Sequence, residues 1–559
     1  MRSKLILAGL IVLAASLAAC AGKTSPKFDI LITGGTVIDG TGAPRRQVDV
    51  GIIADTIAAV GDLAGAWSGR LINASGRIVA PGVIDIHGHS DYSILVDGTA
   101  QSKIRQGVTT EIIGEALSAG PISRAGQNFK RVEAPLWDAD IEWSTLGEYF
   151  QVLERRGSSI NIGSFVGTMS VRRYVIGDTN RNPSDVELDS MCVLVDAAMR
   201  QGALGVSSAL LGSPLTTAEL IAMARVASRH GGIYSTHVRD EGSLIFSSLD
   251  EAFRIGREAD LPVDVIHLKV AERDLWGRMD SVLARFEQAR EEGLDVTANM
   301  YPYIAGQNNL SALIPPEGQD GGRDKMLERL HDPGWRRQFK ETLYAGGRPD
   351  WYNHYTSSAG WESMLVVSTK AEKNQDLIGR RMSEVIEMRG GEPTDVLFDL
   401  LLEEGGSVPT VYFLMSEEDV RTAMVHPLVS FCSDGVAVRP EGPLGKGKPH
   451  PRWYGSFPRI LGRYARDQKV LSLESAVHKM TWQNAEKLGI TGRGLIKVGM
   501  AADLMLFDPE SVLDRATFSD PHHYPEGIEY VLVNGTVVID KGEHTGALPG
   551  RIIYGPGRE

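Results

Sequence analysis

The feature that most constrains the fold is an alternation of short apolar runs with helical patterns through the middle of the chain. The helical patterns are Leu188–Gln201, Thr217–His230, Ser248–Asp260 and Met279–Glu292. Strand-length runs separated by such helices predict βαβ units and a parallel sheet. The candidate strands are Ile78–His87, Val108–Glu115, Ile160–Val166, Leu204–Ala209, Ile233–His237, Val263–Leu268, Asp295–Tyr301 and Leu428–Ser433. We therefore predict an α/β protein with a (β/α)8 barrel of the TIM type.

Two regions lie outside this alternation. Residues 308–424, between the last two candidate strands, are too many for a loop, so we expect an insert that packs beside the barrel mouth. The chain ends resemble each other, because GGTVIDG (34–40) and NGTVVIDKG (534–542) nearly repeat. Alternating apolar residues with glycine turns predict antiparallel strands. We expect a small β-sandwich domain built from residues 27–77 and 495–559, and a barrel domain over 78–494.

The N-terminus has the pattern of an export signal. Arg2 and Lys4 precede an apolar run, Leu5–Leu17. This run is shorter than the roughly 20 residues of a membrane-spanning helix and is typical of a signal peptide. The next residues, LAAC (17–20), resemble the lipobox of bacterial lipoproteins, in which the cysteine is acylated. We expect residues 1–20 to be a lipoprotein signal and Cys20 to anchor the protein in the bacterial cell envelope, on the periplasmic side in a Gram-negative cell. An ordinary secretory signal is the alternative.

Charge and cysteine content narrow the possible partners. The formal net charge is -13 and no long basic run interrupts the acidic balance, so nucleic-acid binding is not expected. Beyond Cys20 the chain has only Cys192 and Cys432. Two widely spaced cysteines do not make a disulfide framework, and whether these two pair stays open. The only membrane contact that we expect is the lipid anchor.

Histidines and carboxylates follow several of the candidate strands at their carboxyl ends. These residues are His87 and His89 after strand one, Glu115 after strand two, His237 and His267 after strands five and six, and Asp434 after strand eight. The carboxyl ends of barrel strands converge on one mouth, where catalysis is located. A single histidine at a strand end is more often structural, but the joint pattern is not. Because imidazole and carboxylate suit zinc or a similar ion, we predict a metal site there.

Several segments resemble the amidohydrolase superfamily and, within it, the N-acyl-D-amino-acid deacylase (D-aminoacylase) group. APGVIDIHGHSD (80–91) resembles the strand-one motif of the superfamily. The segments that resemble the D-aminoacylase group are STHVRDEG (235–242), DVIHLKV (264–270), MYPYIAG (300–306), SFCSDG (430–435) and KPHPRWYGSFPRILGRYARD (448–467). The resemblance implies a metal-dependent enzyme that hydrolyses small N-acyl-D-amino acids to a carboxylate and a D-amino acid.

The chain departs from this group at the end of strand two. Characterised D-aminoacylases have a metal-bridging cysteine there, and this sequence has Ala116 at that position. The lysine that bridges two metals in many superfamily members is also missing from the strand-four candidate, Leu204–Ala209. Glu115, one residue before the missing cysteine, is therefore expected to be the ligand. A supporting carboxylate or a helix cap is the alternative reading of Glu115.

The resemblance implies roles for the metal ligands. Glu115, His237 and His267 would hold one tight zinc ion. His87 and His89 would hold a second, looser divalent ion or complete the shell. Asp434 would act as general acid and base.

The resemblance also implies roles around the substrate. Tyr301 would donate a hydrogen bond to the tetrahedral oxyanion, and an aromatic plug of the barrel mouth is the alternative. The planar guanidinium of Arg452 would grip the substrate α-carboxylate. Lys269 and Arg239 would neighbour the substrate, with a structural or solvated role equally open for each.

Two other functions remain open: another amide hydrolase of the superfamily, such as a dipeptidase or cyclic-amide hydrolase, and a non-catalytic envelope binding protein.

Overall fold

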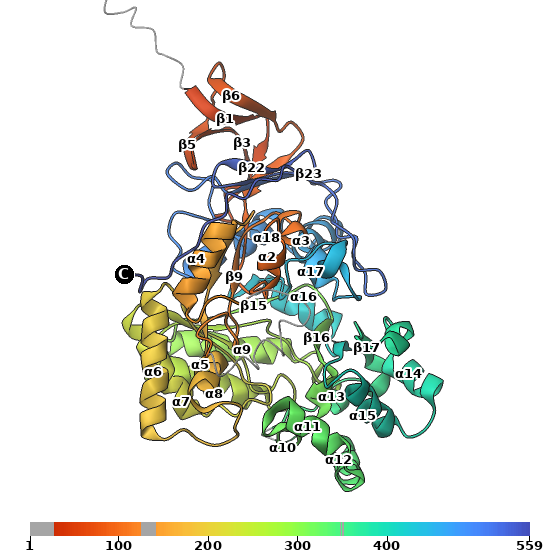
Figure 1. The fold of residues 1–559 in the computed structure, drawn as a ribbon. Helices are drawn as coiled ribbons and strands as arrows, with labels where there is room; N and C mark the ends of the chain where they lie inside the picture. The colour runs from red at the N-terminus through yellow and green to blue at the C-terminus, as the bar shows by residue number, and fades with distance from the viewer. Residues whose placement is uncertain (1–26, 124–140, 347, 349–350) are drawn as a thin grey trace, which may run out of the picture.

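In a computed structural model the chain is described over residues 27–123, 141–346, 348 and 351–559 (Figure 1). The predicted signal peptide and Cys20 lie outside these residues. Within them, no helix has the length and apolar character needed to cross a membrane. Cys192 is half-buried and Cys432 is buried, and both are free thiols, so the two do not form a bridge.

The middle of the chain forms parallel strands in two sheets, ordered β10-β9-β8 and β11-β12-β13-β14-β15-β19. Every hydrogen-bonded neighbour pair within these sheets is parallel. The strands are β8 (Val83–Asp85), β9 (Val108–Ile113), β10 (Asn161–Ser164), β11 (Val166–Gly167), β12 (Gly205–Ala209), β13 (Ile233–His237), β14 (Val263–Val265), β15 (Val296–Met300) and β19 (Val429–Phe431). All eight predicted strands contain one of these segments.

Backbone hydrogen bonds link the two sheets at both of their edges. β10 and β11 are consecutive parts of one run, and the Leu204 N–H donates to the Ser164 carbonyl at 3.0 Å. At the opposite edge, the Asp434 N–H donates to the His87 carbonyl at 2.9 Å. The first and last strands of the series therefore lie next to each other, as the TIM type of α/β fold requires.

Helices follow the strands and cover them from outside (Figure 1). They are α2 (Ser93–Val96), α3 (Gln101–Ile104), α4 (Leu146–Arg156), α5 (Thr168–Ile176), α6 (Asp185–Arg200), α7 (Thr217–Arg229), α8 (Ile245–Ala259), α9 (Met279–Glu291), α16 (Glu417–Val425), α17 (Arg452–Arg459), α18 (Leu473–Met480) and α19 (Trp482–Lys487). Helix α6 begins three residues before the predicted start, because the Ser184 hydroxyl and the Glu187 carboxylate form a reciprocal capping box. Thr216 and Glu219 start α7 in the same way.

The first predicted strand, Ile78–His87, is divided in the structure. Its first part, β7 (Ile78–Pro81), pairs with β20 (Leu504–Phe507) of the C-terminal region, and only β8 joins the parallel strands. Gly82 separates the two parts: a Cβ there would lie 2.2 Å from the Thr109 side chain. Its N–H donates to the Asp503 carbonyl at 2.8 Å. The chain changes sheets at a glycine that packs too closely for any side chain, so Ile78–Pro81 pairs with a terminal strand and the parallel strand begins at Val83.

The chain ends meet in two further sheets, ordered β5-β4-β1-β6 and β23-β22-β21-β20-β7-β2-β3. Their remaining strands are β1 (Lys27–Thr33), β2 (Thr36–Val37), β3 (Arg46–Gln47), β4 (Asp49–Ile53), β5 (Thr56–Gly61), β6 (Trp67–Asn73), β21 (Ile528–Val533), β22 (Thr536–Asp540) and β23 (Glu543–His544). The two terminal sheets are mixed rather than purely antiparallel, because β1 pairs with β6 and β2 with β7 in parallel. Ile30 and Ile52 from the first sheet and Leu504 and Leu532 from the second share one buried apolar cluster. Burial of this shared apolar surface holds the two ends of the chain together.

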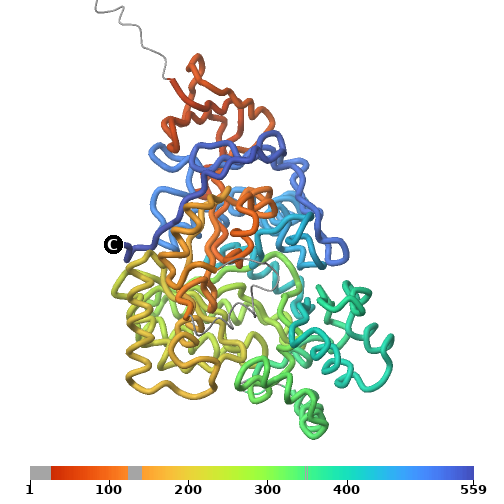
Figure 2. The backbone as a smooth tube through the Cα atoms, viewed as in Figure 1, coloured from red at the N-terminus to blue at the C-terminus, as the bar shows by residue number. Residues whose placement is uncertain are grey.

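The last residues leave these sheets. After β23 the chain runs back along the parallel strands, where the Ile553 N–H donates to the Ile162 carbonyl at 2.8 Å and the Gly555 N–H to the Gly202 carbonyl at 2.8 Å. Figure 2 shows this tail, in blue, passing beside the orange and yellow segments to the C-terminus. Residues 545–559 thus pack beside the parallel strands, outside the terminal sheets with which the sequence analysis grouped them.

The insert adds an antiparallel sheet, ordered β16-β18-β17, and several helices. They are β16 (Ala305–Asn309), α10 (Pro316–Gln319), α11 (Gly322–Leu330), α12 (Pro333–Ala345), α13 (His354–Ser357), β17 (Met364–Val366), α14 (Met382–Arg389), α15 (Pro393–Glu403) and β18 (Pro409–Phe413). Helix α16 falls inside the predicted insert 308–424 but contacts α9 and β19, as a barrel helix does. Within the predicted insert, α16 thus packs on the last parallel strand, whereas the segments up to Phe413 form the sheet β16-β18-β17 and its helices.

Candidate metal and active site

The structure gathers the six predicted ligands at the carboxyl ends of the parallel strands. The His89 Nε2 atom lies 3.0 Å from the Asp434 Oδ1 atom, and the His87 Nε2 atom lies 3.4 Å from the Glu115 Oε2 atom. The His237 Nδ1 atom lies 3.6 Å from the Glu115 Oε1 atom. Since the six residues come from five different strand ends, the parallel order of the strands is what brings them together.

Three overlapping groups of these side chains have the geometry of a metal site. The ligand atoms within each group lie within 4.8 Å of one another, and the groups are His87, His267 and Asp434; His87, His89 and Glu115; and Glu115, His237 and His267. The His87 Nε2 atom is buried without a hydrogen-bond partner in the structure. A buried imidazole nitrogen without a partner is costly, and a divalent cation would satisfy it. The donor set therefore fits a metal with nitrogen and oxygen ligands.

The charges of the cluster keep Glu115, His267 and Asp434 in metal-binding form. Burial opposes the charge of Glu115, but His87, His237 and His89 outweigh it and lower the Glu115 pKa to about 2. Burial, together with nearby Lys269 and His237, lowers the His267 pKa to about 4, which keeps this imidazole neutral. Burial likewise opposes the charge of Asp434, but Arg452 and the histidines hold its pKa well below the usual range. A carboxylate and a neutral imidazole are the forms that bind metal. Burial opposes the charge of His89 and His237, but the neighbouring carboxylates outweigh it and raise their pKa to about 9, so each of these two imidazoles gives up a proton when it binds a metal.

Three residues at the strand ends that carry these ligands have a left-handed backbone conformation. Ala116, His267 and Asp434 have φ angles of 49°, 39° and 46°, in the left-handed region that residues other than glycine rarely adopt. Such conformations persist only where the surrounding structure enforces them, and they cluster at functional sites. The strained backbone at these positions is consistent with a site in which the surrounding structure fixes the orientation of the His267 and Asp434 side chains.

Glu115 directly precedes Ala116, the position at which the resemblance described above implies a cysteine. The Ala116 methyl group offers no ligand. The longer Glu115 side chain places its carboxylate within 3.2 Å of the His89 Nε2 atom. This geometry agrees with Glu115 as a ligand, which stays a prediction.

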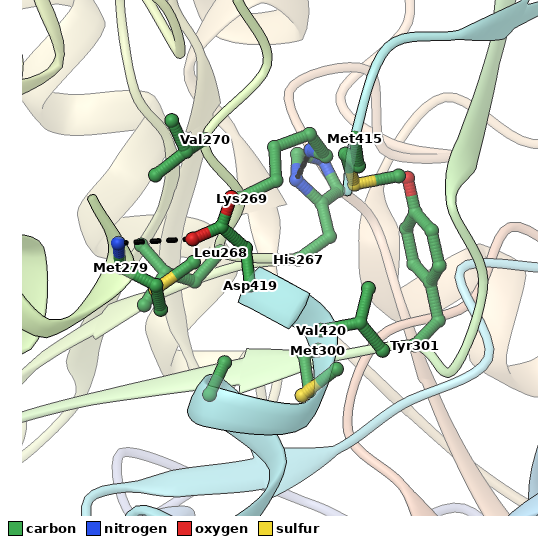
Figure 3. A pocket seen from close by; sticks show the side chains of 11 residues that line it. His267, Leu268, Lys269, Val270, Met279, Met300, Tyr301, Met415, Asp419 and Val420 are labelled. Carbon is green, nitrogen blue, oxygen red and sulfur yellow. Dashed lines mark hydrogen bonds between the residues drawn. The ribbon is translucent and has the colours of Figure 1, made fainter. Parts of the chain in front are cut away.

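Three of the four predicted substrate-binding residues lie beside the ligands. Figure 3 shows Tyr301 and Lys269 on either side of His267. The Lys269 Nζ atom lies 2.6 Å from the His267 Nδ1 atom. The Arg452 guanidinium forms an ion pair with Asp434 at 2.8 Å and lies 4.6 Å from the centre of the Tyr301 ring. Burial raises the Tyr301 pKa well above its usual value, so the hydroxyl keeps its proton as a donor.

Arg239 is not brought to this cluster. Its guanidinium binds the Glu251 carboxylate with two hydrogen bonds of 2.9 Å. It also donates to the carbonyls of Ser213 and Leu215. These four bonds tie the loop after β13 to the start of α7 and to α8, so the observed role of Arg239 is structural, one of the two readings that the sequence left open.

Two residues of the site were missed in the sequence. Glu241, four residues after His237, contacts His237, His267 and Lys269. His450 is buried, accepts the Arg452 N–H at 3.0 Å and binds the Ala305 carbonyl at 2.9 Å, which fixes the start of α17. The segments HVRDEG and PHPR contained both residues, but nothing local in either segment indicated a contact with a distant strand.

A further cavity lies between the strand ends and the insert. It has a volume of about 170 Å³, and its lining includes Leu211, Asn308, Trp351, Tyr352 and His354. Tyr352 also donates its hydroxyl hydrogen to the Ala271 carbonyl at 2.9 Å. The insert thus forms one wall of this cavity.

Comparison with known proteins agrees with this geometry. Residues 70–539 match the profile of the Amidohydrolase family. The chain is 35% identical to D-aminoacylase of Alcaligenes xylosoxydans xylosoxydans over 537 residues, covering 95% of this chain and 98% of that protein.

Solved structures agree with the sequence comparison. A crystal structure of D-aminoacylase superposes with a TM-score of 0.78 and 35% identity, covering 94% of this chain and 99% of the other. The N-acyl-D-glutamate deacylase of Bordetella bronchiseptica, solved with zinc and a phosphonate inhibitor, superposes with a TM-score of 0.79 and 30% identity, covering 94% and 100%. The chain therefore belongs to the amidohydrolase family, within the group that contains D-aminoacylase.

Proposed function

We propose that this protein is a metal-dependent hydrolase of N-acyl-D-amino acids, which it cleaves to a carboxylate and a D-amino acid. The observation that carries the proposal is the ion pair between Arg452 and Asp434, which puts a carboxylate-binding guanidinium 2.8 Å from a candidate proton carrier at the ligand cluster. The similarity to D-aminoacylase over nearly the whole of both chains supports the same activity.

We propose zinc as the metal, held by Glu115, His237 and His267. His87 and His89 would contribute to a second, looser site. The related N-acyl-D-glutamate deacylase was solved with zinc, which supports this choice. A bound zinc ion supplies Lewis-acid activation of water and of the scissile carbonyl.

The residues around the metal would provide proton transfer, stabilisation of the oxyanion and binding of the substrate carboxylate. The Asp434 carboxylate takes a proton from the attacking water and passes it to the leaving amine, as a general base and then a general acid. The Tyr301 hydroxyl donates a hydrogen bond to the oxygen on which negative charge develops. Arg452 holds the substrate α-carboxylate with its planar guanidinium, and Lys269 adds a second positive charge beside it.

Preference for the D-enantiomer follows from three fixed points. The ligand cluster fixes the scissile carbonyl, Arg452 fixes the α-carboxylate, and the strand ends with the insert leave one direction for the side chain. With the carbonyl and the α-carboxylate held, inversion at the α-carbon would turn the substrate side chain into the strand ends or the insert. Discrimination by such a clash can be large, since it is repulsive rather than a lost contact.

The experiment is a parallel assay of N-acetyl-D- and N-acetyl-L-methionine, leucine and phenylalanine with the purified enzyme and its Arg452→Ala variant. We expect turnover of the D-enantiomers and a strongly raised KM for Arg452→Ala. Arg463→Ala is the matched control, because Arg463 pairs only loosely with Glu417 at 3.9 Å. Equal rates for both enantiomers, or an unchanged KM in Arg452→Ala, would refute the assignment. Turnover of dipeptides or cyclic amides instead would favour another amide hydrolase of the family.

We further propose that the parallel strands form one closed (β/α)8 barrel and that the sheets of the chain ends form a separate small β domain. The hydrogen bond from Asp434 to the His87 carbonyl supports closure, and the apolar cluster shared by the two terminal sheets supports a separate unit. For the N-terminus we propose a lipoprotein signal that ends in an acylated Cys20, on the strength of the LAAC segment. The protein would then be anchored in the bacterial cell envelope.

A further inference from the structure

Glu241 lies where three basic groups of the candidate site converge. Its Oε1 atom is 3.3 Å from the His237 Nε2 atom and 3.3 Å from the His267 Nδ1 atom. The same oxygen forms an ion pair with the Lys269 ammonium. The carboxylate is buried, with 8% of its side chain exposed. No role for this residue follows from the predicted ligand set, although it contacts two of the ligands.

The two histidines turn different nitrogens toward Glu241. His237 faces Glu115 with Nδ1, so Nε2 is the nitrogen on the Glu241 side. His267 faces Glu241 and Lys269 with Nδ1, which leaves Nε2 for the ligand cluster. A neutral imidazole that binds a metal through one nitrogen carries its hydrogen on the other. Metal binding through the other nitrogens would leave an N–H at His237 Nε2 and at His267 Nδ1. The His237 Nε2 atom is buried without a hydrogen-bond partner in the structure, and the Glu241 Oε1 atom lies 3.3 Å from both nitrogens.

We propose that Glu241 is the positioning residue of this site: one carboxylate oxygen accepts the outward N–H of both metal-binding histidines and holds the Lys269 ammonium. The inference rests on the proposed metal site and extends it beyond its ligands. Carboxylates that accept the second N–H of a metal-bound histidine fix its tautomer and orientation and raise its basicity. Here one residue does so for two ligands from neighbouring strands, β13 and β14.

Glu241 also links the ligands to the substrate. In the structure Lys269 lies within hydrogen-bonding distance of both His267 Nδ1 and Glu241 (Figure 3 shows Lys269 beside His267). A His267 that carries hydrogen on Nδ1 has no lone pair there for an ammonium. Lys269 then keeps only its bond to Glu241, and its other hydrogens become available to a substrate carboxylate. Binding of the metal thus prepares Lys269 for the substrate.

The loop that carries Glu241 is held rigidly by its own backbone contacts. The Asp240 carboxylate accepts the N–H groups of Gly242 and Leu244, at 2.8 and 3.0 Å. The Ala271 N–H donates to the Glu241 carbonyl at 2.8 Å, which ties this loop to the segment after β14. The carboxylate is therefore set in place before any metal binds, as a positioning group must be.

The test is the zinc affinity of Glu241→Gln, measured by competition with a chromophoric chelator on the full chain after removal of metal. The amide has the shape of the carboxylate but no charge, and it can accept fewer of the three donors. We expect the zinc affinity to fall about 10–100-fold. Glu251→Gln is the matched control: it removes a carboxylate ten residues along the chain that binds Arg239 and contacts no ligand. Its zinc affinity should equal that of the unaltered protein.

Two further measurements separate positioning from other roles. Lys269→Met should keep its zinc affinity, since the carboxylate and not the ammonium holds the histidines. The visible spectrum of the cobalt-substituted Glu241→Gln protein should keep its band positions, because the ligands themselves are unchanged. A zinc affinity equal to the unaltered protein, or a cobalt spectrum that reports a lost ligand, would overturn the proposal. These readouts use no substrate, so they stand apart from any failure of the proposed activity.

Discussion

A buried lysine beneath the candidate site gives the sharpest prediction about stability. The Lys103 Nζ atom lies 2.7 Å from Asp85, 3.0 Å from Glu111 and 2.7 Å from the Ser433 hydroxyl. The side chains of Lys103, Asp85 and Glu111 are fully buried. Burial opposes the charge of Lys103, but the two carboxylates outweigh it and raise its pKa. The ammonium therefore neutralises carboxylates that have no access to water.

Lys103→Met should destabilise the protein by about 3–5 kcal/mol, the usual cost of removing one partner of a buried ion pair. At about 2.1 cal/mol/K of unfolding entropy per residue, a chain of 559 residues has an unfolding entropy of about 1.2 kcal/mol/K. The expected loss in Tm is thus about 3–4 °C by calorimetry. Because Ser433 precedes Asp434, activity should fall as well.

Two comparisons check this reasoning. Lys325→Met removes an exposed pair with Glu328 and should cost less than about 1 kcal/mol, the value for surface pairs. Burial raises the Glu111 pKa, so adding Glu111→Gln to Lys103→Met removes one of the unpaired carboxylates and should recover part of the lost stability. An unchanged or raised Tm in Lys103→Met would refute the argument that this ammonium compensates the buried carboxylates.

Four other predictions follow from the chain. Glu115→Ala should lose most of its bound metal, measured by elemental analysis; full metal content would remove Glu115 from the ligand set. Asp434→Asn should keep its metal but lose about 10²–10⁴-fold in kcat, and near-normal turnover would exclude it from proton transfer. Burial lowers the Lys479 pKa to about 7, so above that pH the unfolded chain holds more protons and the free energy of unfolding rises, by at most about 1.4 kcal/mol per pH unit. Denaturant titrations from about pH 7 to pH 9 should show this rise, and Lys479→Met should abolish it; identical pH profiles would count against it. Cys20→Ala should leave the detergent phase on partitioning, and unchanged partitioning would disprove the lipid anchor.

The local sequence was enough to locate the strands and to group the candidate metal ligands. The parallel strands fall within the short segments that alternate with helical patterns, and His87, His237 and His267 lie at the ends of three of them. Parallel strands end at a common edge, so residues at successive strand ends are neighbours in any fold of this type. His87, His237, His267 and Asp434 could therefore be grouped without knowledge of a single contact.

Only the tertiary structure decided which other side chains reach this edge and where the domains part. Glu241 and Arg239 stand two residues apart in the same motif, yet one turns to the ligands and the other to Glu251. The change of sheet at Gly82 depends on the approach of Thr109, and the course of residues 545–559 depends on carbonyls such as that of Ile162. These contacts join segments distant in the chain. A local pattern of hydrophobicity cannot predict these contacts, because it indicates which residues are buried and not which residues they contact.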